Sequence, residues 1–328
     1  PSIMLSRVAD ALYWMTRYLE RVENISRFVD VHWHLTLDLP RNGMQEWGAL
    51  VRITGDTDVF RERYEGFDRQ SVLSFLMFDS TYPHSILSCL RAARENARSV
   101  REIISNDLWE QVNDFYHLVV DASRHPGALY INPHDFCQQI SLRGMMLGGI
   151  HNETMNHGEG WHFGRVGRFL ERADTTSRIR DVTYFILLPV VSYVGTAYAD
   201  VQWGALLRAT SGFNAYRQRH GRIVPANVAD FLIFDRIFPR SILFSLNAAL
   251  ASLCSISGTP PGTFRNEAEQ RLGKLCAVLA YTDIATVFES GLHEFTDNLQ
   301  SDINKVNDAI GTAFFGYASD APINDQEQ

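Results

Sequence analysis

The chain has 328 residues, of which 45% are hydrophobic, and a net charge of −8. This length predicts two structural units or one large bundle with a sizeable core. The negative balance disfavours general nucleic-acid binding, which relies on clustered cations facing phosphates. No run reaches the roughly 20 apolar residues that a membrane span needs, because the longest candidate, residues 184–199, contains Pro189. The N-terminal segment lacks a signal-peptide pattern, so we expect a cytoplasmic protein that contacts neither nucleic acid nor membrane.

The basic residues and the cysteines are informative by type and spacing. Lys274 and Lys305 are the only lysines among the 30 basic residues, so nearly all the positive charge is arginine. Arginine suits bidentate contacts with carboxylates and phosphates, although a GC-rich genome would also explain the bias.

The four cysteines are far apart and form no CxxC pair, which predicts reduced, mostly buried thiols.

Apolar spacing and helix-ending residues predict helices along the whole chain. In the first, apolar residues recur at steps of three and four from Leu5 to Val29, Ser6 is a candidate N-cap and Pro40 ends the region. Only residues 127–131 (GALYI) hint at a strand. The predicted helices cover about 6–39, 44–53, 69–79, 83–102, 106–122 and 133–155, and then 161–187, 201–209, 226–235, 239–257, 263–280 and 283–313.

Three blocks of sequence occur twice and in the same order. RYLERVENISRFVDV (17–31) matches RFLERADTTSRIRDV (168–182). WGALVRITG (47–55) matches WGALLRATS (203–211), and FLMFDSTYPHSILSCL (75–90) matches FLIFDRIFPRSILFSL (231–246). Three collinear matches indicate an internal duplication.

The fold class that follows is an all-α, internally duplicated helical bundle, with two roughly six-helix halves related by a pseudo-twofold axis. We expect the first helical repeat at residues 1–157 and the second at 158–318. Glycine-rich sequence leads almost directly from one into the other, so we expect them to pack as one compact unit. Residues 319–328 form a polar tail.

A charged stripe runs along the first helix of each half. It comprises Arg17, Glu20, Arg21, Asn24 and Arg27 in the first copy, and Arg168, Glu171, Arg172, Thr175 and Arg178 in the second. Within one helix, Arg17 can reach Glu20 and Glu23 can reach Arg27. Large aromatic residues flank both stripes, which predicts burial, and buried charges must be paired. If the two helices meet at the centre, two glutamates and four arginines converge.

Two roles for this cluster remain open. The arginines, with Glu20, Glu171 and Asn24, could bind the carboxylate or phosphate group of a substrate. They could instead form a structural network that fixes how the halves dock. Glu20 and Glu171 are weak candidates for acid–base catalysis, because neighbouring arginines lower a carboxyl pKa.

Other candidate sites are weaker. His32 and His34 form an HxH pair whose side chains diverge on a helix, and no HExxH motif occurs, so we expect no metal and no cofactor. Gly164 and Gly167 are better explained by close helix packing than by a phosphate loop. No Rossmann, P-loop, nucleophile-elbow or Cys/His nucleophile motif is present in the sequence.

The stretches MLSRVADALYWMTRYLERVEN and GWHFGRVGRFLERADTTSR together resemble the Alpha-E family of bacterial all-helical proteins with a Glu-Arg motif. The resemblance extends from Met4 to about residue 313. It places the motif on Glu20 and Arg21 and again on Glu171 and Arg172.

The resemblance implies a functional context rather than a catalytic residue. Alpha-E proteins are encoded beside, or fused to, circularly permuted ATP-grasp proteins and transglutaminase-like peptidases. This implies an accessory subunit or partner in ATP-dependent amide-bond formation on a peptide or a small amine or carboxylate substrate, with the nucleotide chemistry supplied by the partner. The alternatives are a stand-alone amide transferase or hydrolase that uses Glu20 or Glu171, and a scaffold in which the clusters only lock the halves.

Overall fold

The computed structural model describes residues 4–38, 47–187 and 197–316. All regular structure in these ranges is helical, which confirms the all-α prediction. The predicted polar tail at 319–328, the helix-ending Pro40 and Pro189 of the longest apolar run lie outside the described residues.

Each half contains long helices and short connecting ones. The first half contains α1 (Ser6–Asp38), α2 (Gly48–Thr54), α3 (Thr57–Arg61), α4 (Arg69–Leu73), the π-helical turn η1 (Ser74–Phe78), α5 (Ile86–Ser99), α6 (Asn106–Arg124), α7 (Gly127–Ile131) and α8 (His134–Thr154). The second half contains α9 (Glu159–Leu187), α10 (Ala197–Ala209), α11 (Phe213–His220), α12 (Pro225–Phe234), α13 (Ile242–Ser257), α14 (Glu267–Ala280), α15 (Ile284–Ser290), α16 (Leu292–Ile310) and the π-helical turn η3 (Gly311–Phe315).

Several short elements differ from the sequence prediction. The suggested strand at 127–131 is wrong, because this isolated segment forms the helical turn α7. The short helices α3 and α11 were not predicted. The single helix predicted at 283–313 is divided at Gly291, whose φ of +94° interrupts the helix between α15 and α16.

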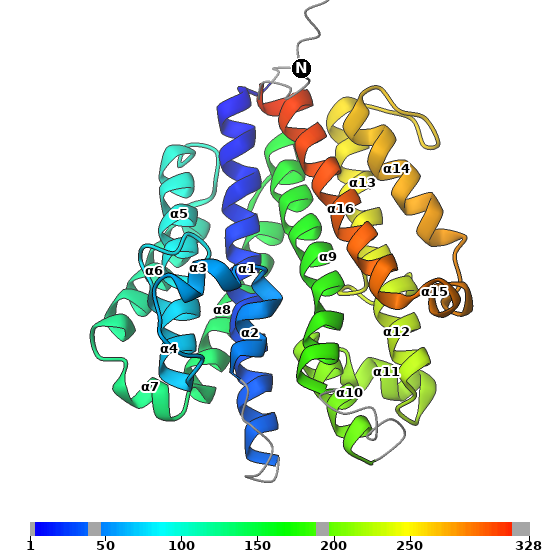
Figure 1. Cartoon of the computed structure of the whole chain (residues 1–328). Coiled ribbons are helices and arrows are strands. Elements are labelled where there is room, and N and C mark those ends of the chain that lie inside the picture. The colour runs from blue at the N-terminus through cyan, green and yellow to red at the C-terminus, as the bar shows by residue number, and fades with distance from the viewer. Residues whose placement is uncertain (1–3, 39–46, 188–196, 317–328) are drawn as a thin grey trace, which may run out of the picture.

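Helices α1 and α9 lie side by side at the centre and run in the same direction (Figure 1). Helix α1 packs against α5 and α8, and α9 packs against α13 and α16, so the two halves have the same order of neighbours. The matched sequence blocks therefore occupy matched places in the fold. The predicted boundary between residues 157 and 158 falls in the turn between α8 and α9.

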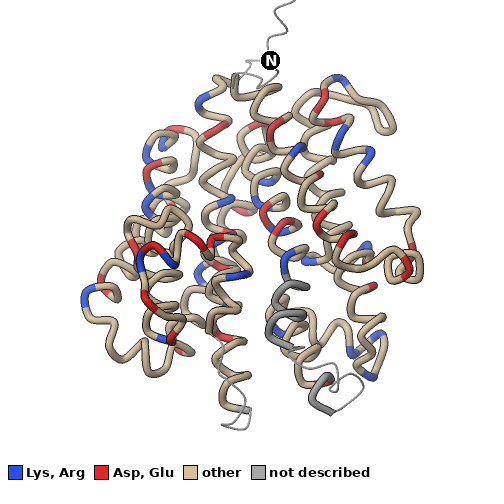
Figure 2. The backbone as a smooth tube through the Cα atoms, in the orientation of Figure 1, with Lys and Arg blue, Asp and Glu red and all other residues tan. Residues whose placement is uncertain are grey.

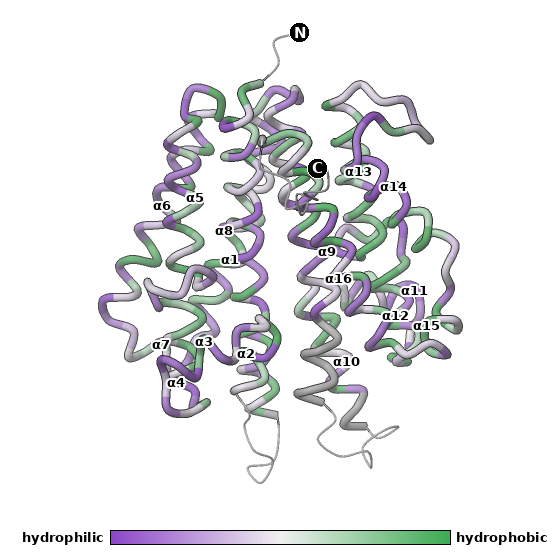
Figure 3. The backbone as a smooth tube through the Cα atoms, turned by 45° about the horizontal axis from the view of Figure 1, so that its top comes forward, coloured by the Kyte–Doolittle hydropathy of each residue, from purple (hydrophilic) through white to green (hydrophobic). Residues whose placement is uncertain are grey.

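The apolar core extends across both halves. It includes Tyr13 and Met15 of α1, Leu170 of α9 and Leu246 of α13, all fully buried. The outer helices show the expected amphipathic pattern, since hydrophilic and hydrophobic residues alternate along α6 (Figure 3). A smaller apolar cluster joins α10, α11 and α12.

Charged residues of both signs are interspersed over both halves (Figure 2). Among the described helices, none combines the length and the apolar content required to cross a membrane. All four cysteines are free thiols, and Cys89, Cys137 and Cys276 are buried, as the sequence predicts.

The backbones of α1 and α9 approach closely at two glycines. The carbonyl oxygen of Gly164 accepts a hydrogen bond from Thr16 Oγ1 at 2.7 Å. A Cβ atom at Gly167 would lie 2.2 Å from the carbonyl oxygen of Tyr13, a backbone atom that cannot rotate away. The prediction that these glycines serve close helix packing is confirmed.

We predict that Gly167→Ala lowers the free energy of unfolding by about 1–3 kcal/mol or more, because the methyl group must separate the central helices. Urea unfolding of the full chain measures this. Gly149→Ala is the matched control: a Cβ there meets nothing within 4 Å, so the substitution is expected to stabilise α8 by about 0.5–1 kcal/mol. Equal effects of the two substitutions would contradict the close approach.

Candidate functional site

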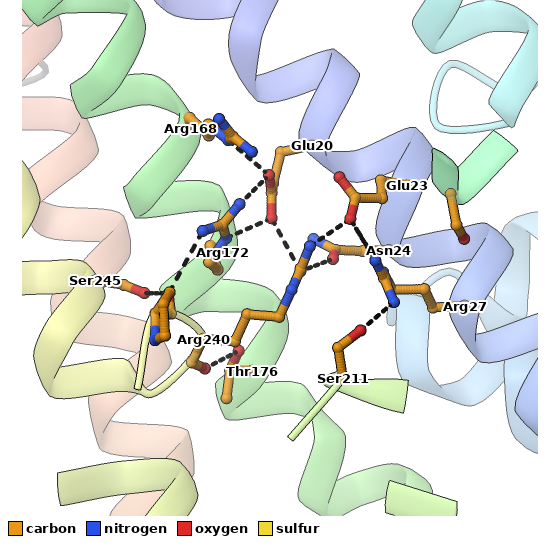
Figure 4. Close-up of polar contacts among 12 residues, drawn as sticks. Glu20, Glu23, Asn24, Arg27, Arg168, Arg172, Thr176, Ser211, Arg240 and Ser245 are labelled. Carbon is orange, nitrogen blue, oxygen red and sulfur yellow. Dashed lines mark hydrogen bonds and ion pairs between the residues drawn. The ribbon is translucent and has the colours of Figure 1, made fainter. Parts of the chain in front are cut away.

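The two glutamates of the repeated motif exchange partners across the central helices. Glu20 of α1 accepts hydrogen bonds from α9, at 2.7 Å from Arg172 Nε, 2.8 Å from Arg172 Nη2 and 3.3 Å from Arg168 Nε (Figure 4). Each Arg172 nitrogen takes one carboxylate oxygen, which is the bidentate geometry that guanidinium groups favour. The glutamate of the first Glu-Arg motif is therefore bound by the arginine of the second motif, with Arg168 as a further donor.

The reciprocal contact has the same form. Glu171 of α9 accepts hydrogen bonds from α1, at 2.9 Å from Arg17 Nε, 2.6 Å from Arg21 Nε and 3.0 Å from Arg21 Nη2. The i+3 spacing allows Arg17 to reach Glu20 within α1, but Arg17 extends across to Glu171 instead. Interhelical pairing prevails because a facing helix offers each buried carboxylate two guanidinium groups rather than one.

A second layer of ion pairs lies one turn further along each helix. Arg27 donates from Nη2 to Glu23 Oε1 at 2.7 Å, as the sequence predicts for this i,i+4 pair. Arg178 makes the corresponding bond in α9, from Nε to Asp174 Oδ2 at 3.0 Å. The cluster thus contains four carboxylates in two matched pairs.

Burial and charge act in opposite directions on the central glutamates. Glu20 and Glu171 are each 2% exposed. Burial alone would raise the pKa of Glu171, but Arg21 and Arg17 outweigh it and lower the pKa to about 2. The pKa of Glu20 is also lowered, since Arg172, Arg240 and Arg168 outweigh the desolvation. Both carboxylates are ionised at neutral pH and are poor proton donors.

Arg240, which the sequence analysis did not single out, completes the Glu20 side. It lies in the loop before α13, and its Nη1 is 3.3 Å from Glu20 Oε1 and 3.2 Å from Asn24 Oδ1. Its Nη2 also binds Glu23. Burial and nearby Arg172 lower the pKa of Arg240 to about 10, so it remains charged at neutral pH. A loop residue has no periodic pattern to reveal its contacts, and only the alignment of YPHS with FPRS marks the position.

A cavity of about 200 Å³ adjoins the Glu171 side of the cluster. Apolar side chains of α1, α2 and η1 form part of its wall, and its polar lining comprises Arg21, Asn24, Thr54, Asp56, Tyr82, His84, Glu171, Asp174, Thr175 and Arg178. Asn24 is 6% exposed, and its Nδ2 has no hydrogen-bond partner within the described part of the chain. The cavity therefore offers charged groups of both signs.

All seven residues predicted to bind substrate lie in one cluster, but they lie differently with respect to the cavity. Arg21, Asn24 and Glu171 line it. The remaining four do not line the cavity and form ion pairs of the cluster instead: Arg17, Glu20, Arg168 and Arg172. Arg178, Asp174 and His84 are lining residues that the predicted site did not include.

The histidines of the HxH pair diverge as predicted. His32 is buried against Trp47, and burial lowers its pKa to about 4. The side chain of His34 lies close enough to Asp30 and to His134 of α8 for the three to share one metal ion. Asp30 already accepts hydrogen bonds from His134 Nδ1 at 2.6 Å and Gln138 Nε2 at 2.7 Å, which accounts for this cluster without a metal. The expectation of no metal stays a prediction.

The fold and the cluster define a class of protein: an all-helical bundle whose two central helices are joined by reciprocal Glu-Arg motifs. The chain belongs to the Alpha-E family, described as a predicted alpha-helical domain with a conserved ER motif, whose model matches residues 4–315. The resemblance seen in the sequence is thereby confirmed.

Similar proteins include uncharacterised proteins of mycobacteria. Protein Mb2597 of Mycobacterium bovis and protein MT2643 of Mycobacterium tuberculosis are each 28% identical over 272 residues, and protein Rv2567 of Mycobacterium tuberculosis is 27% identical over the same length. The matches cover 77% of this chain but only 30% of each relative. No solved structure matches the chain.

We predict that Glu171→Gln and Glu20→Gln each lower the free energy of unfolding by about 3–5 kcal/mol, because each leaves buried guanidinium groups without their counter-charge. Urea unfolding at pH 7 measures the loss. Asp121→Asn is the control, since Asp121 pairs with Arg124 at 2.8 Å on the exposed surface and such pairs contribute at most about 1 kcal/mol. A loss below about 1 kcal/mol in both glutamate variants would show that the cross-pairs do not hold the halves together.

Stability is also expected to depend on acid pH. The pKa of Glu171 is about 2 in the folded chain against an ordinary value of 4.5, so the folded state favours the ionised carboxylate. Its contribution is complete above about pH 4.5 and is lost as the pH falls toward about 2. Urea midpoints measured between pH 7 and pH 3 are expected to fall more steeply for the wild type than for Glu171→Gln; parallel curves would contradict this assignment.

Proposed function

We propose that this protein is a helical subunit or partner of an ATP-grasp-type peptide or amide ligase, and that it holds a carboxylate- or phosphate-bearing substrate or intermediate beside the Glu/Arg cluster. The observation that carries this proposal is the cavity of about 200 Å³ at one side of the cluster. Arg21 and Arg178 on its wall supply the guanidinium groups that bind such anions.

The charge balance of the cluster supports an anionic ligand group. Seven arginines pair with four acidic residues: Arg17, Arg21, Arg27, Arg168, Arg172, Arg178 and Arg240 with Glu20, Glu23, Glu171 and Asp174. The buried excess of positive charge favours a further anion.

The role as a partner rests on family context and on the chemistry of the glutamates. The sequence has no ATP-grasp or transglutaminase signature, so nucleotide chemistry belongs to another polypeptide or to another part of the same one. The matched part makes up 30% of each mycobacterial relative, which is compatible with fusion to further domains. A stand-alone transferase or hydrolase is less well supported, because Glu20 and Glu171 are both held ionised by arginines.

The scaffold alternative is favoured by one specific observation, the reciprocal pairing of Glu20 and Glu171 across the central helices. Locking and binding are compatible, because the residues that lock most deeply, Arg17 and Arg172, are not on the cavity wall. We therefore assign the lock to the central pairs and the binding function to the cavity beside them.

We predict that Arg178→Gln lowers the ligation activity of the chain co-expressed with its ATP-grasp partner by at least roughly tenfold, because a ligand anion loses a charged donor. Co-purification with the partner and the folded state, followed by circular dichroism, are expected to be unchanged. The matched control is Arg27→Gln, the corresponding position of the other half, which forms the same i,i+4 pair but does not line the cavity.

Equal activity of Arg178→Gln and the wild type, with both folded, would contradict binding at the cavity. Turnover by the isolated chain without an ATP-grasp protein would instead support the enzymatic alternative.

A further inference from the structure

One of the positions at which the two repeats differ lies beside the Glu/Arg cluster. Aligning YPHS with FPRS places His84 opposite Arg240. Arg240 inserts its guanidinium group among Glu20, Glu23 and Asn24 (Figure 4). The repeat places Glu171, Asp174 and Thr175 at the corresponding positions of the other half.

In the first half, these three residues face a cavity where the other half has the additional guanidinium group of Arg240. Glu171, Asp174 and Thr175 all line the space of about 200 Å³, and His84 lies at its exposed side. His84 is shorter than arginine, and its Nδ1 lies 2.8 Å from Arg21 Nη1. One half thus fills the position with its own cation, whereas the other leaves it open beside equivalent acidic groups.

The carboxylates of the cavity lining, as distinct from the net charge of the whole cluster, suit a cation at this position. The cavity wall carries three carboxylates, Asp56, Glu171 and Asp174, and only two guanidinium groups, Arg21 and Arg178. Burial and nearby Arg21 lower the pKa of His84, so its ring is not a source of positive charge at neutral pH. The other half shows that carboxylates already bound by arginines accept one more, since Glu20 binds Arg240 in addition to Arg168 and Arg172.

We infer that the cavity binds an alkylguanidinium or alkylammonium group, as at the end of an arginine or lysine side chain or in a small amine. The cationic head lies toward Glu171 and Asp174, where Arg240 provides the internal template for it. The methylene chain lies against the apolar wall formed by Ile25, Phe28 and Leu50. This deepens the proposed function and rests on it for its biological meaning: the substrate carries a cationic nitrogen group as well as an anion.

Binding of n-butylguanidinium to the full chain tests the inference, with uncharged n-butylurea as its isosteric control. Calorimetry is expected to show binding of n-butylguanidinium to about one site, and at least roughly tenfold weaker binding of n-butylurea. Comparison with n-butylammonium distinguishes the two kinds of cation. Tighter binding of n-butylguanidinium identifies a guanidinium ligand, and tighter binding of n-butylammonium identifies an ammonium ligand. Equal binding of n-butylguanidinium and n-butylurea, or no binding of either cation, would overturn the inference.

The variant His84→Arg gives the sharpest control, because it rebuilds the arrangement of the other half. Its guanidinium group is expected to occupy the cavity, to abolish n-butylguanidinium binding and to leave the melting temperature unchanged or higher. Undiminished binding by this variant, once folded, would refute the site. If His84→Arg does not fold, Asp174→Asn is the second variant. It is expected to bind n-butylguanidinium at least roughly tenfold more weakly. Unchanged affinity of this variant would also refute the site.

These measurements need no ATP-grasp partner, so their failure is distinguishable from failure of the proposed function. Absent cation binding with an intact effect of Arg178→Gln on ligation would remove only the cationic subsite. Cation binding without any ligation phenotype would remove the ligase role and leave the subsite.

Discussion

The structure depends on one reciprocal interaction, in which each central glutamate is bound by arginines of the opposite helix. Glu20 and Glu171 are each 2% exposed, so either carboxylate would be costly to bury alone. Arg172 binds Glu20 and Arg21 binds Glu171. The buried carboxylate of each central helix is therefore neutralised only when the other helix is in place. This exchange explains why two repeats form one core, and it fixes the relative position of α1 and α9.

The same exchange separates structural residues from candidate binding residues. Arg17 and Arg172 are committed to buried carboxylates, whereas Arg21 also reaches the cavity wall. The repeated sequence blocks place equivalent residues in both halves, and an open position is needed in only one half for binding. His84 stands at the position equivalent to Arg240 and lines the cavity, whereas Arg240 binds Glu20 in the other half.

The two sides of the cluster have matched ion pairs but different surroundings. The ion pairs of Arg27 with Glu23 and of Arg178 with Asp174 occupy matched positions, yet only the second pair lines the cavity. The cluster as a whole is positive, while the cavity lining itself carries three carboxylates and two guanidinium groups. The proposed ligand, which bears both an anion and a cationic nitrogen, is complementary to both features.

The sequence by itself determined the helical class, the repeat and the Glu-Arg stripes, because helical periodicity and the matched blocks are local properties of the chain. It also indicated why Gly164 and Gly167 are small. It did not reveal that Arg17 binds Glu171 rather than Glu20, that Gly291 divides a helix, or that Arg240 enters the cluster from a loop. Those features were decided by the tertiary structure, because a buried charge is neutralised by whichever group the packing brings nearest, regardless of separation along the chain.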